Sequence, residues 1–211
     1  MPRISLSVIK RMPRYYRFLS ELERSGAMRV SSRELSEKMG LTASQIRQDL
    51  NCFGGFGQQG YGYNVSQLRD EIGVILGLED NYKCIIIGAG NLGRTLATHM
   101  NFKKRGFRLS AIFDNNEAFA GQMVAGMPIR HVSGLDDFCR LEKPSIAVLC
   151  VPQEAASALG EQLARLGVKG IWNFSHYDFS GELTDIAIEN VHLGDSLMTL
   201  SYKVKNGCDS M

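Results

Sequence analysis

The spacing of apolar residues predicts a small helical module in the first third of the chain. Apolar side chains recur at steps of three and four from Val8 to Leu22, which predicts an amphipathic helix ending near residue 26. Ser31 and Glu34 have the spacing of a capping box, in which each side chain satisfies a backbone N–H group at a helix start. The second helix that they begin stops at Gly40, because glycine favours the left-handed conformation that ends helices.

A third helix is predicted to follow a tight turn. Thr42 and Gln45 repeat the capping-box spacing, and the helix runs on to Phe53. Two short helices joined in this way are typical of a helix-turn-helix, whose second helix enters the major groove with its N-terminal residues on base edges. The candidate base contacts are Ser44, Gln45, Arg47 and Gln48.

Two more elements complete the predicted module. Glycine and aromatic residues alternate over residues 54–63, which predicts a β-hairpin, and a hairpin directly after a helix-turn-helix is a wing. Apolar spacing over residues 64–77 predicts a fourth helix. The alternative is a helix bundle without a role in nucleic-acid binding. The wing, the paired capping-box spacings and a basic first helix together favour DNA binding.

The second third of the chain carries the pattern of a dinucleotide-binding fold. A short apolar run from Lys83 to Ile87 predicts a buried parallel strand, and a helix is predicted from Arg94 to Asn101. The glycine-rich motif G-x-G-x-x-G lies between them, which is the context that the motif requires. Its glycines permit a tight turn, close approach to a pyrophosphate, and close helix packing. The motif residues are Gly88, Ala89, Gly90, Asn91, Leu92 and Gly93.

Asp114 is predicted to bind the adenosine ribose of the dinucleotide. It ends the next predicted strand, Phe107 to Phe113, at the distance from the glycine motif where an acidic residue binds ribose hydroxyl groups. Asn115 and Asn116 follow it, and neither could pair with the 2′-phosphate of NADP(H). The sequence therefore predicts NAD(H) as the cofactor.

Further alternation of strands and helices predicts a doubly wound parallel sheet. Strands are predicted over residues 145–151, 170–173 and 186–191, with a helix over residues 153–166. Ligands of such sheets lie at the carboxyl ends of the strands. This rule adds Val151, Pro152, Asn173 and Phe174 to the candidate cofactor-binding residues.

A small NAD(H)-dependent oxidoreductase with an extra helical domain is the alternative function. Such an enzyme needs a substrate-holding segment and a proton-transfer group near the nicotinamide. Only 19 residues follow His192, and of the four histidines only His176 lies at the predicted rim. We therefore expect no catalytic residue in this chain.

The last segment has an apolar stripe that must be buried by something. Leu193, Leu197, Leu200 and Val204 are spaced by four, three and four, which predicts an amphipathic helix. The stripe can pack on its own domain or on a second subunit.

Composition narrows the class of protein further. Of 211 residues, 44% are hydrophobic and 22% are charged, as in ordinary globular proteins, and no apolar run approaches the roughly 20 residues that span a bilayer. The five cysteines are scattered and form no C-x-x-C pair, so we expect no disulfide framework and no metal site. We expect a reducing, cytoplasmic location and no membrane partner.

The net charge of +2 conceals an asymmetry between the two parts of the chain. Residues 1–78 hold 11 Lys and Arg against 7 Asp and Glu, whereas residues 79–211 hold 13 against 15. A basic first part agrees with nucleic-acid binding, although a solvated basic face would give the same balance.

Taken in order, these motifs resemble the Rex family of redox-sensing transcriptional repressors. The resemblance covers nearly the whole chain and rests on the helix around Arg47, the glycine and aromatic segment after it, and the glycine-rich motif. It continues through the segments at residues 151–156, 167–174 and 200–202. It implies a homodimer with domain-swapped C-terminal helices. It further implies binding to a palindromic operator when NAD⁺ is high and release when NADH binds.

The resemblance also implies site residues, some of which depart from the family pattern. Arg47 matches the base-reading arginine, and Arg11 and Arg14 are expected to contact the DNA backbone. Gln48, Gln58 and Gln59 stand where the family has basic residues, so fewer phosphate contacts are expected.

The switch positions depart from the pattern as well. Arg17 matches a switch arginine in the first helix. His99 and His192 occupy the positions of a tyrosine and an aspartate that the family uses in its switch. Either a His–His contact makes the switch pH-dependent, or these are two unrelated surface histidines.

We therefore expect an α/β protein in three parts. These are a winged-helix DNA-binding domain (residues 1–78), a Rossmann NAD(H)-binding domain (79–192) and a C-terminal dimerisation helix (193–211).

Overall fold

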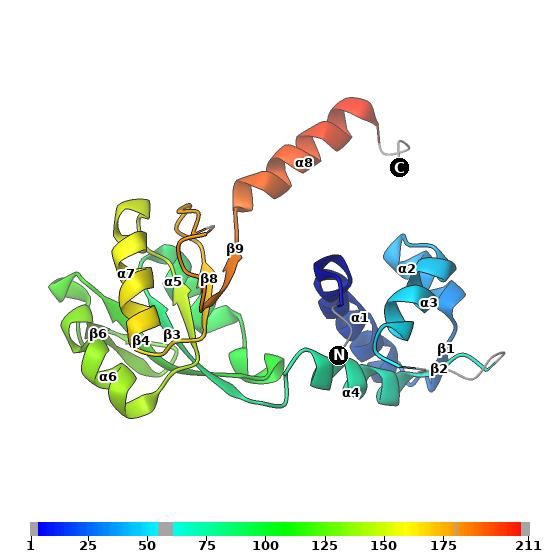
Figure 1. The fold of residues 1–211 in the computed structure, drawn as a ribbon, viewed down its shortest axis with the longest axis horizontal. Helices are drawn as coiled ribbons and strands as arrows, with labels where there is room; N and C mark the ends of the chain where they lie inside the picture. The colour runs from blue at the N-terminus through cyan, green and yellow to red at the C-terminus, as the bar shows by residue number, and fades with distance from the viewer. Residues whose placement is uncertain (1–3, 55–60, 180, 208–211) are drawn as a thin grey trace. The chain divides into compact units, whose positions relative to one another are not determined.

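The chain folds into two compact units, residues 1–79 and 80–211 (Figure 1). They are described from a computed structural model, which covers residues 4–54, 61–179 and 181–207. The first unit contains α1 (Leu6–Arg24), β1 (Arg29–Val30), α2 (Ser32–Met39), α3 (Ala43–Asn51), β2 (Tyr63–Asn64) and α4 (Val65–Ile75).

The first unit is a helix bundle around one apolar core. The apolar stripe predicted for the first helix is buried along α1, and it meets side chains from α2, α3 and α4. The predicted capping box is formed at α2, where Ser31 Oγ accepts from the Glu34 N–H and Glu34 accepts from the Ser31 N–H. Gly40 ends this helix in the left-handed conformation. The core residues are Val8, Met12, Tyr15, Leu19, Val30, Leu35, Met39, Ile46, Leu50, Val65, Leu68 and Ile72.

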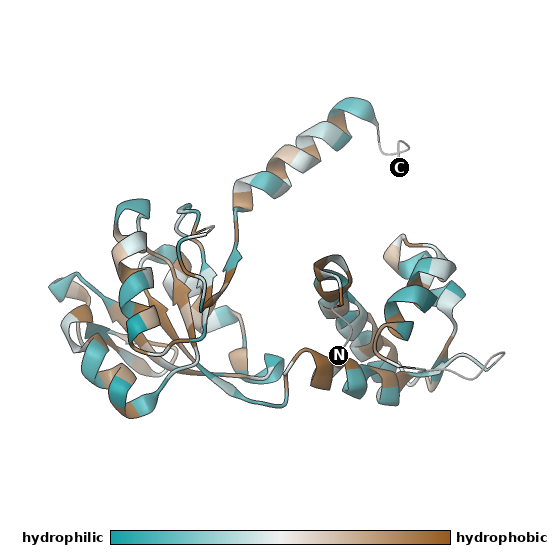
Figure 2. Cartoon of the chain, viewed as in Figure 1, coloured by the Kyte–Doolittle hydropathy of each residue, from teal (hydrophilic) through white to brown (hydrophobic). Residues whose placement is uncertain are grey.

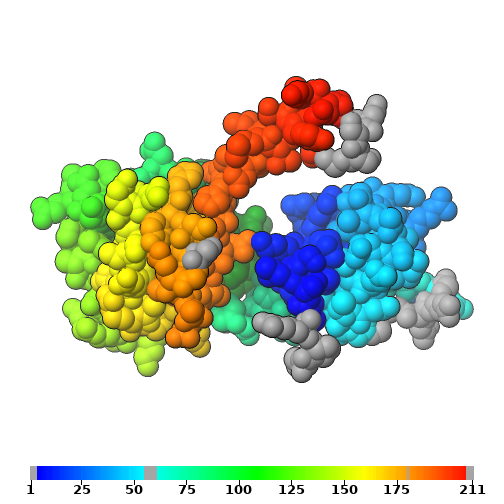
Figure 3. Space-filling model, turned by 45° about the horizontal axis from the view of Figure 1, so that its top comes forward, coloured from blue at the N-terminus to red at the C-terminus, as the bar shows by residue number. Residues whose placement is uncertain are grey.

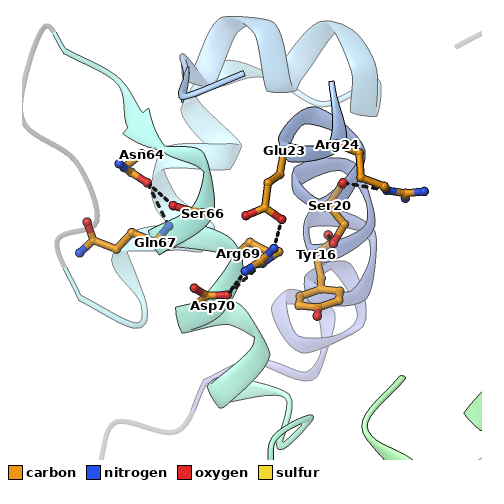
Figure 4. A network of polar contacts seen from close by, with 9 residues as sticks. All are labelled: Tyr16, Ser20, Glu23, Arg24, Asn64, Ser66, Gln67, Arg69 and Asp70. Carbon is orange, nitrogen blue, oxygen red and sulfur yellow. Dashed lines mark hydrogen bonds and ion pairs between the residues drawn. The ribbon is translucent and has the colours of Figure 1, made fainter. Parts of the chain in front are cut away.

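An ion pair joins α4 to α1 (Figure 4). Arg69 of α4 forms an ion pair with Glu23 of α1 and a second one with its neighbour Asp70. Asn64 caps the start of α4 by accepting a hydrogen bond of 3.0 Å from the Gln67 N–H. The two helices at the ends of the unit are thereby held together, which closes the module.

The described end of the predicted wing, β2, pairs with β1. Tyr63 pairs with Val30 and Asn64 with Arg29 in an antiparallel ladder, so β2 returns to a strand that precedes the helix-turn-helix. Gly62 allows this approach, because its φ is +69° and a Cβ there would lie 2.7 Å from the carbonyl oxygen of Val30. Most of the predicted hairpin, including Gln58 and Gln59, lies outside the described residues.

The second unit is the doubly wound sheet that the sequence predicts. Its strands lie in the order β5-β6-β4-β3-β7-β8-β9, and every pairing is parallel except that of the edge strand β5. Its strands are β3 (Tyr82–Ile87), β4 (Phe107–Asp114), β5 (Met123–Val124), β6 (Met127–His131), β7 (Ile146–Leu149), β8 (Gly170–Asn173) and β9 (Ala187–Asn190). Its helices are α5 (Asn91–His99), η1 (Phe102–Arg105), η2 (Glu117–Phe119), η3 (Val132–Gly134), α6 (Leu135–Glu142), α7 (Gln153–Arg165) and α8 (Leu193–Asn206).

Helices cover both faces of this sheet and give it two cores. Ile85 and Ile87 of β3 pack with residues of α6 and α7, whereas Cys84 and Ile86 pack with Ala97 of α5 on the other face. This alternation is the two-residue period of a strand. The covered sheet forms a close-packed body, drawn from green to orange in Figure 3.

Helix α8 exposes the apolar stripe that the sequence predicts. Figure 2 shows hydrophobic and hydrophilic residues interspersed along α8. None of its residues is buried, and Leu197 and Val204 are 67% and 77% exposed. Among the described residues, no helix is long and apolar enough to cross a membrane.

Candidate functional site

The outer face of α3 presents three of the four residues predicted to read bases. Ser44, Arg47 and Gln48 are exposed and lie on one side of the helix. Arg47 also donates a hydrogen bond of 3.1 Å to Ser32 Oγ at the start of α2. Its guanidinium is thereby held at the junction of the two helices while it stays open to a ligand.

The opposite side of α3 is fastened to α1 by a carboxylate that the sequence analysis did not single out. Asp49 is fully buried, and it accepts bonds of 2.7 Å from both Nε and Nη2 of Arg11 and one of 3.0 Å from Tyr15 Oη. Burial raises the pKa of this carboxyl, but the hydrogen bonds from Arg11, Gln45 and Tyr15 outweigh burial and hold it below its usual value.

This network changes the interpretation of two predicted DNA contacts. The charge of Arg11 is already paired with Asp49, so the expected contact of Arg11 with the DNA backbone stays a prediction, and its observed role is structural. Gln45 uses its side chain to reach Asp49 and does not complete the predicted second capping box, of which only the bond from the Gln45 N–H to Thr42 is formed.

The exposed arginines of the first unit also include Arg14, Arg17 and Arg29. The guanidinium carbons of Arg14 and Arg17 each lie 5.8 Å from the ring centroid of Phe18 on α1. Arg29 was missed, because it lies far in sequence from the predicted wing. The pairing of β1 with β2 brings it to Tyr61, where its Nη1 donates a hydrogen bond of 3.0 Å to the carbonyl oxygen.

The glycine-rich motif forms the turn from β3 into α5. Gly88 has a φ of +100°, and a Cβ there would lie 2.2 Å from the carbonyl oxygen of Cys150. A Cβ on Gly93 would lie 1.9 Å from the carbonyl oxygen of Gly88, so this glycine permits the close helix packing. Gly90 differs from both, because a Cβ there would meet nothing within 4 Å. The open side of Gly90 is where a phosphate can approach the backbone and the helix N-terminus.

A cleft of about 620 Å³ opens beside this turn, at the carboxyl ends of β3, β4 and β7. This is the place where doubly wound sheets bind ligands. Five predicted residues line it: Gly88, Gly90, Asp114, Val151 and Pro152. The lining residues that were not predicted are mainly apolar and include Phe119, Val132, Cys150, Ala155, Ala158 and Leu159.

Asp114 is positioned by the backbone around it. Its Oδ2 accepts a bond of 2.6 Å from the Ala89 N–H of the glycine turn, and its Oδ1 accepts 2.8 Å from the Asn116 N–H. Each carboxylate oxygen can accept more than one hydrogen bond, so Asp114 can also accept from ligand hydroxyl groups. The observed contacts hold the carboxylate at the cleft before a ligand arrives.

Arg94 joins the glycine turn to the wall of the cleft. Its Nε donates a hydrogen bond of 2.7 Å to the carbonyl oxygen of Ala89, and its Nη2 donates one of 2.9 Å to Gln122 Oε1. Its guanidinium carbon lies 4.7 Å from the ring centroid of Phe119, which lines the cleft. The sequence shows this arginine directly after the motif, but its contacts with Gln122 and Phe119 lie too far along the chain to infer.

Asn173 and Phe174, predicted at the rim, do not line the cleft. The side-chain amide of the buried Asn173 donates a hydrogen bond of 2.6 Å to the Tyr177 carbonyl oxygen and one of 2.8 Å to Asn190 Oδ1. Phe174 packs edge to face on Trp172. The side chain of Asn173 at the end of β8 therefore bonds to the following loop and to β9.

The predicted switch histidines do not meet within one chain. His99 is exposed at the end of α5, and His192 stacks on His176 with ring centroids 6.1 Å apart. A contact of His99 with His192 therefore stays a prediction that concerns a second subunit.

Cys150 lines the cleft with a thiol that burial keeps protonated. Burial raises the pKa of the Cys150 thiol at the cleft to about 12, so the thiol stays protonated at neutral pH. Among the described residues, no three side chains of metal-binding type cluster together.

Comparison with known families divides the chain in the same way as the fold. Residues 3–51 match the family described as "Putative DNA-binding protein N-terminus", and residues 79–177 match the family described as "CoA binding domain".

Whole-chain relatives and solved structures agree with one another. The redox-sensing transcriptional repressor Rex of Thermoanaerobacter pseudethanolicus is 50% identical over 96% of this chain and 90% of its own length. The crystal structure of RSP with β-NAD⁺ and operator DNA matches with a TM-score of 0.89 at 50% identity, covering 97% of this chain and 94% of that one. RSP in complex with β-NADH matches with a TM-score of 0.88 at 47% identity, covering 97% and 95%.

Proposed function

Since the chain belongs to the Rex family of redox-sensing transcriptional repressors, we propose that it binds operator DNA through α3 and releases it when NADH occupies the cleft beside Gly90. The protein is a transcriptional regulator that responds to NADH and NAD⁺, not an enzyme. The observation that carries the proposal is the match of nearly the whole chain to RSP bound to both NAD⁺ and operator DNA.

In the proposed complex, the exposed face of α3 lies in the major groove. Arg47 donates to a guanine, for which arginine has the matching pair of donors. Arg14 and Arg29 lie exposed on α1 and at the base of the wing, where they reach backbone phosphates. The neutral Gln48 reduces the number of phosphate contacts, so binding depends less steeply on salt than it would with a cation there.

The cleft is proposed to hold the adenosine and pyrophosphate of NAD(H). Asp114 accepts from the ribose hydroxyl groups, and the pyrophosphate lies over Gly90 at the start of α5. CoA shares the adenosine diphosphate but carries a phosphate on its ribose, which the Asp114 carboxylate repels. The cleft is therefore expected to prefer NAD(H) over both CoA and NADP(H).

We further propose that the chain acts as a homodimer held by α8. The helix exposes Leu193, Leu197, Leu200 and Val204, and an apolar stripe of this length is normally covered. Two copies of α8, each covering the partner subunit, would bury both stripes. A two-fold symmetric dimer then requires a palindromic operator with two half-sites.

NADH is proposed to act by changing the spacing of the two DNA-binding units. A dimer whose recognition helices no longer fit the half-site spacing releases its operator. Shifting a dimer from almost fully competent to almost fully incompetent takes about 5.5 kcal/mol of differential affinity, shared over its sites. NAD⁺ and NADH have the same adenosine half, so the contacts with Gly90 and Asp114 serve both, and discrimination occurs at the nicotinamide end.

A cytoplasmic location is part of the proposal. It is supported by the function, which requires access to DNA, and by the thiols of Cys52, Cys84, Cys139 and Cys150, which are free.

The proposal is tested by titrating an operator duplex with the full-length protein, without cofactor, with NAD⁺ and with NADH. The expected result is tight binding with NAD⁺ and loss of binding with NADH, with CoA having no effect. Equal binding in NAD⁺ and NADH would contradict the redox response. Steady oxidation of NADH by a small carbonyl compound would instead support the oxidoreductase alternative.

A further inference from the structure

The side-chain amide of Gln45 is held in one orientation by Asp49. Gln45 lies in the first turn of α3, and its Nε2 donates 2.9 Å to Oδ1 of the buried Asp49. The two residues are one helical turn apart, so the contact runs along the flank of the helix, and the partly exposed Gln45 lies next to Gln48 of the exposed face.

The chemistry of Asp49 determines which end of the amide faces it. The carboxylate is ionised, because it accepts two bonds from the Arg11 guanidinium and one from the Tyr15 hydroxyl. An ionised carboxylate can only accept hydrogen bonds, so the NH₂ group of Gln45 must face it. The flipped amide would place Oε1 against Oδ1, which sets two acceptors against each other.

The carbonyl oxygen Oε1 is therefore the end of the amide that is left for another partner. Gln45 is only partly buried, and no residue in the described part of the chain donates to Oε1. The first turn of a recognition helix is where side chains meet base edges. An acceptor at this point matches the exocyclic amino group of adenine or cytosine, the amino donors of the major groove.

We propose that Gln45 is a specificity-determining residue that reads an exocyclic amino group through Oε1, and that Asp49 is the positioning residue that orients its amide. The inference rests on the proposed placement of α3 in the operator. It differs from the usual pairing of glutamine with adenine, in which the amide nitrogen also bonds the base. Here the nitrogen is retained by Asp49, and the oxygen alone makes the contact.

Base analogues in an operator test this mode of reading. The operator is first selected from randomised duplexes by the full-length protein with NAD⁺, and each adenine or cytosine of a half-site is then replaced by purine or pyrimidin-2-one, which lack the amino group. At one position the replacement should weaken binding of the wild-type protein by roughly tenfold. The same replacement should leave the operator affinity of the Gln45→Ala variant unchanged.

Other outcomes of this experiment overturn the proposal. If removing the amino group weakens binding by the same factor in Gln45→Ala as in the wild type, Gln45 does not read that amino group. If 7-deazaadenine weakens binding at that position, the amide nitrogen takes part in the contact. Failure to select any operator, or selection that does not depend on Arg47, would contradict the proposed function and not only this inference.

The Asp49→Asn variant tests the positioning role. Arg11 donates to both oxygens of the Asp49 carboxylate, whereas an asparagine has only one acceptor oxygen, so Gln45 Nε2 no longer has a fixed acceptor and its amide can turn either end outward. The expected result is a relaxed preference at the Gln45 position, where guanine and thymine are accepted as well as adenine and cytosine, with the preference at the Arg47 position unchanged. A uniform loss of affinity for every operator would mean that Asp49 is only structural. If Asp49→Asn does not fold, the analogue experiment on the wild-type protein decides the proposal.

Discussion

The carboxylate of Asp49 in α3 accepts two hydrogen bonds of 2.7 Å from the guanidinium of Arg11 in α1, although Asp49 is fully buried. These two helices are 38 residues apart along the chain at this contact. The pair therefore fixes α3 against α1, and it accounts for a charged residue in the core.

Arg11→Met is expected to destabilise the first unit by about 3 kcal/mol, because it leaves a buried carboxylate without its cation. Native-state hydrogen exchange of α1 and α3 measures the change, with α5 and α7 of the second unit as internal references. Arg14→Met is the matched control, since Arg14 is exposed on the same helix. Equal exchange in the two variants would contradict a stabilising role for the pair.

The same pair predicts how stability depends on pH. The pKa of Asp49 is lowered in the folded state, so its contribution is fully present above the unfolded-state pKa of about 4. The contribution is lost as the pH falls through the lower folded-state pKa. In Arg11→Met, acidification should lower the free energy of unfolding of the first unit by less than it does in the wild type. A larger decrease in the variant than in the wild type would contradict this prediction.

Arg47→Ala is expected to reduce specific operator binding by roughly 100-fold per dimer while leaving the affinity for NADH unchanged. The physical reason is that Arg47 is exposed on α3 and, within the described part of the chain, donates a side-chain hydrogen bond only to Ser32, so its removal leaves the core intact. Footprinting and NADH titration measure the two effects. Arg33→Ala on α2 is the control, and an unchanged footprint for Arg47→Ala would remove α3 from the interface.

Gly90→Val is expected to abolish NADH binding and to leave a repressor that NADH cannot release. The backbone of Gly90 has ordinary extended angles and a Cβ there meets nothing, so the variant should fold. The side chain instead fills the space where the pyrophosphate approaches. Gly90→Ala should have a smaller effect. An NADH affinity that survives valine would mean that the dinucleotide binds elsewhere.

Leu197→Asp in α8 is expected to dissociate the dimer and to weaken operator binding. No residue of α8 is buried within the chain, so the substitution should not unfold the subunit. Sedimentation velocity measures the oligomeric state. Thr199→Asp on the other side of the helix is the matched control, and a Leu197→Asp dimer as stable as that control would exclude α8 from the interface.

The parts of the fold predicted from the sequence are those that depend on neighbouring residues. The turn at Gly88 to Gly93, the strand before it and the capping box at Ser31 follow from spacing within a few positions. The strand β6 and the helix α6 were not identified. In β6 only Ile129 is buried and Pro128 interrupts the pattern, and α6 spans only eight residues.

The parts of the site that were missed depend on contacts between distant segments. Arg29 reaches Tyr61 only through the pairing of β1 with β2, and Asp49 receives its partner from another helix. Asn173 looked like a rim residue because it ends a strand, but its amide is used by Tyr177 and Asn190. Position in the sequence predicts which end of a strand a residue occupies, and not which partner its side chain finds.

The central claim is that the operator and NADH exclude each other through one dimer. The most direct test is the affinity for NADH, measured by calorimetry with and without saturating operator duplex, with Gly90→Val as the control for non-specific binding. Because coupling between two sites is reciprocal, operator should weaken NADH binding by the same factor by which NADH weakens operator binding. An affinity for NADH that is identical with and without operator would contradict the account.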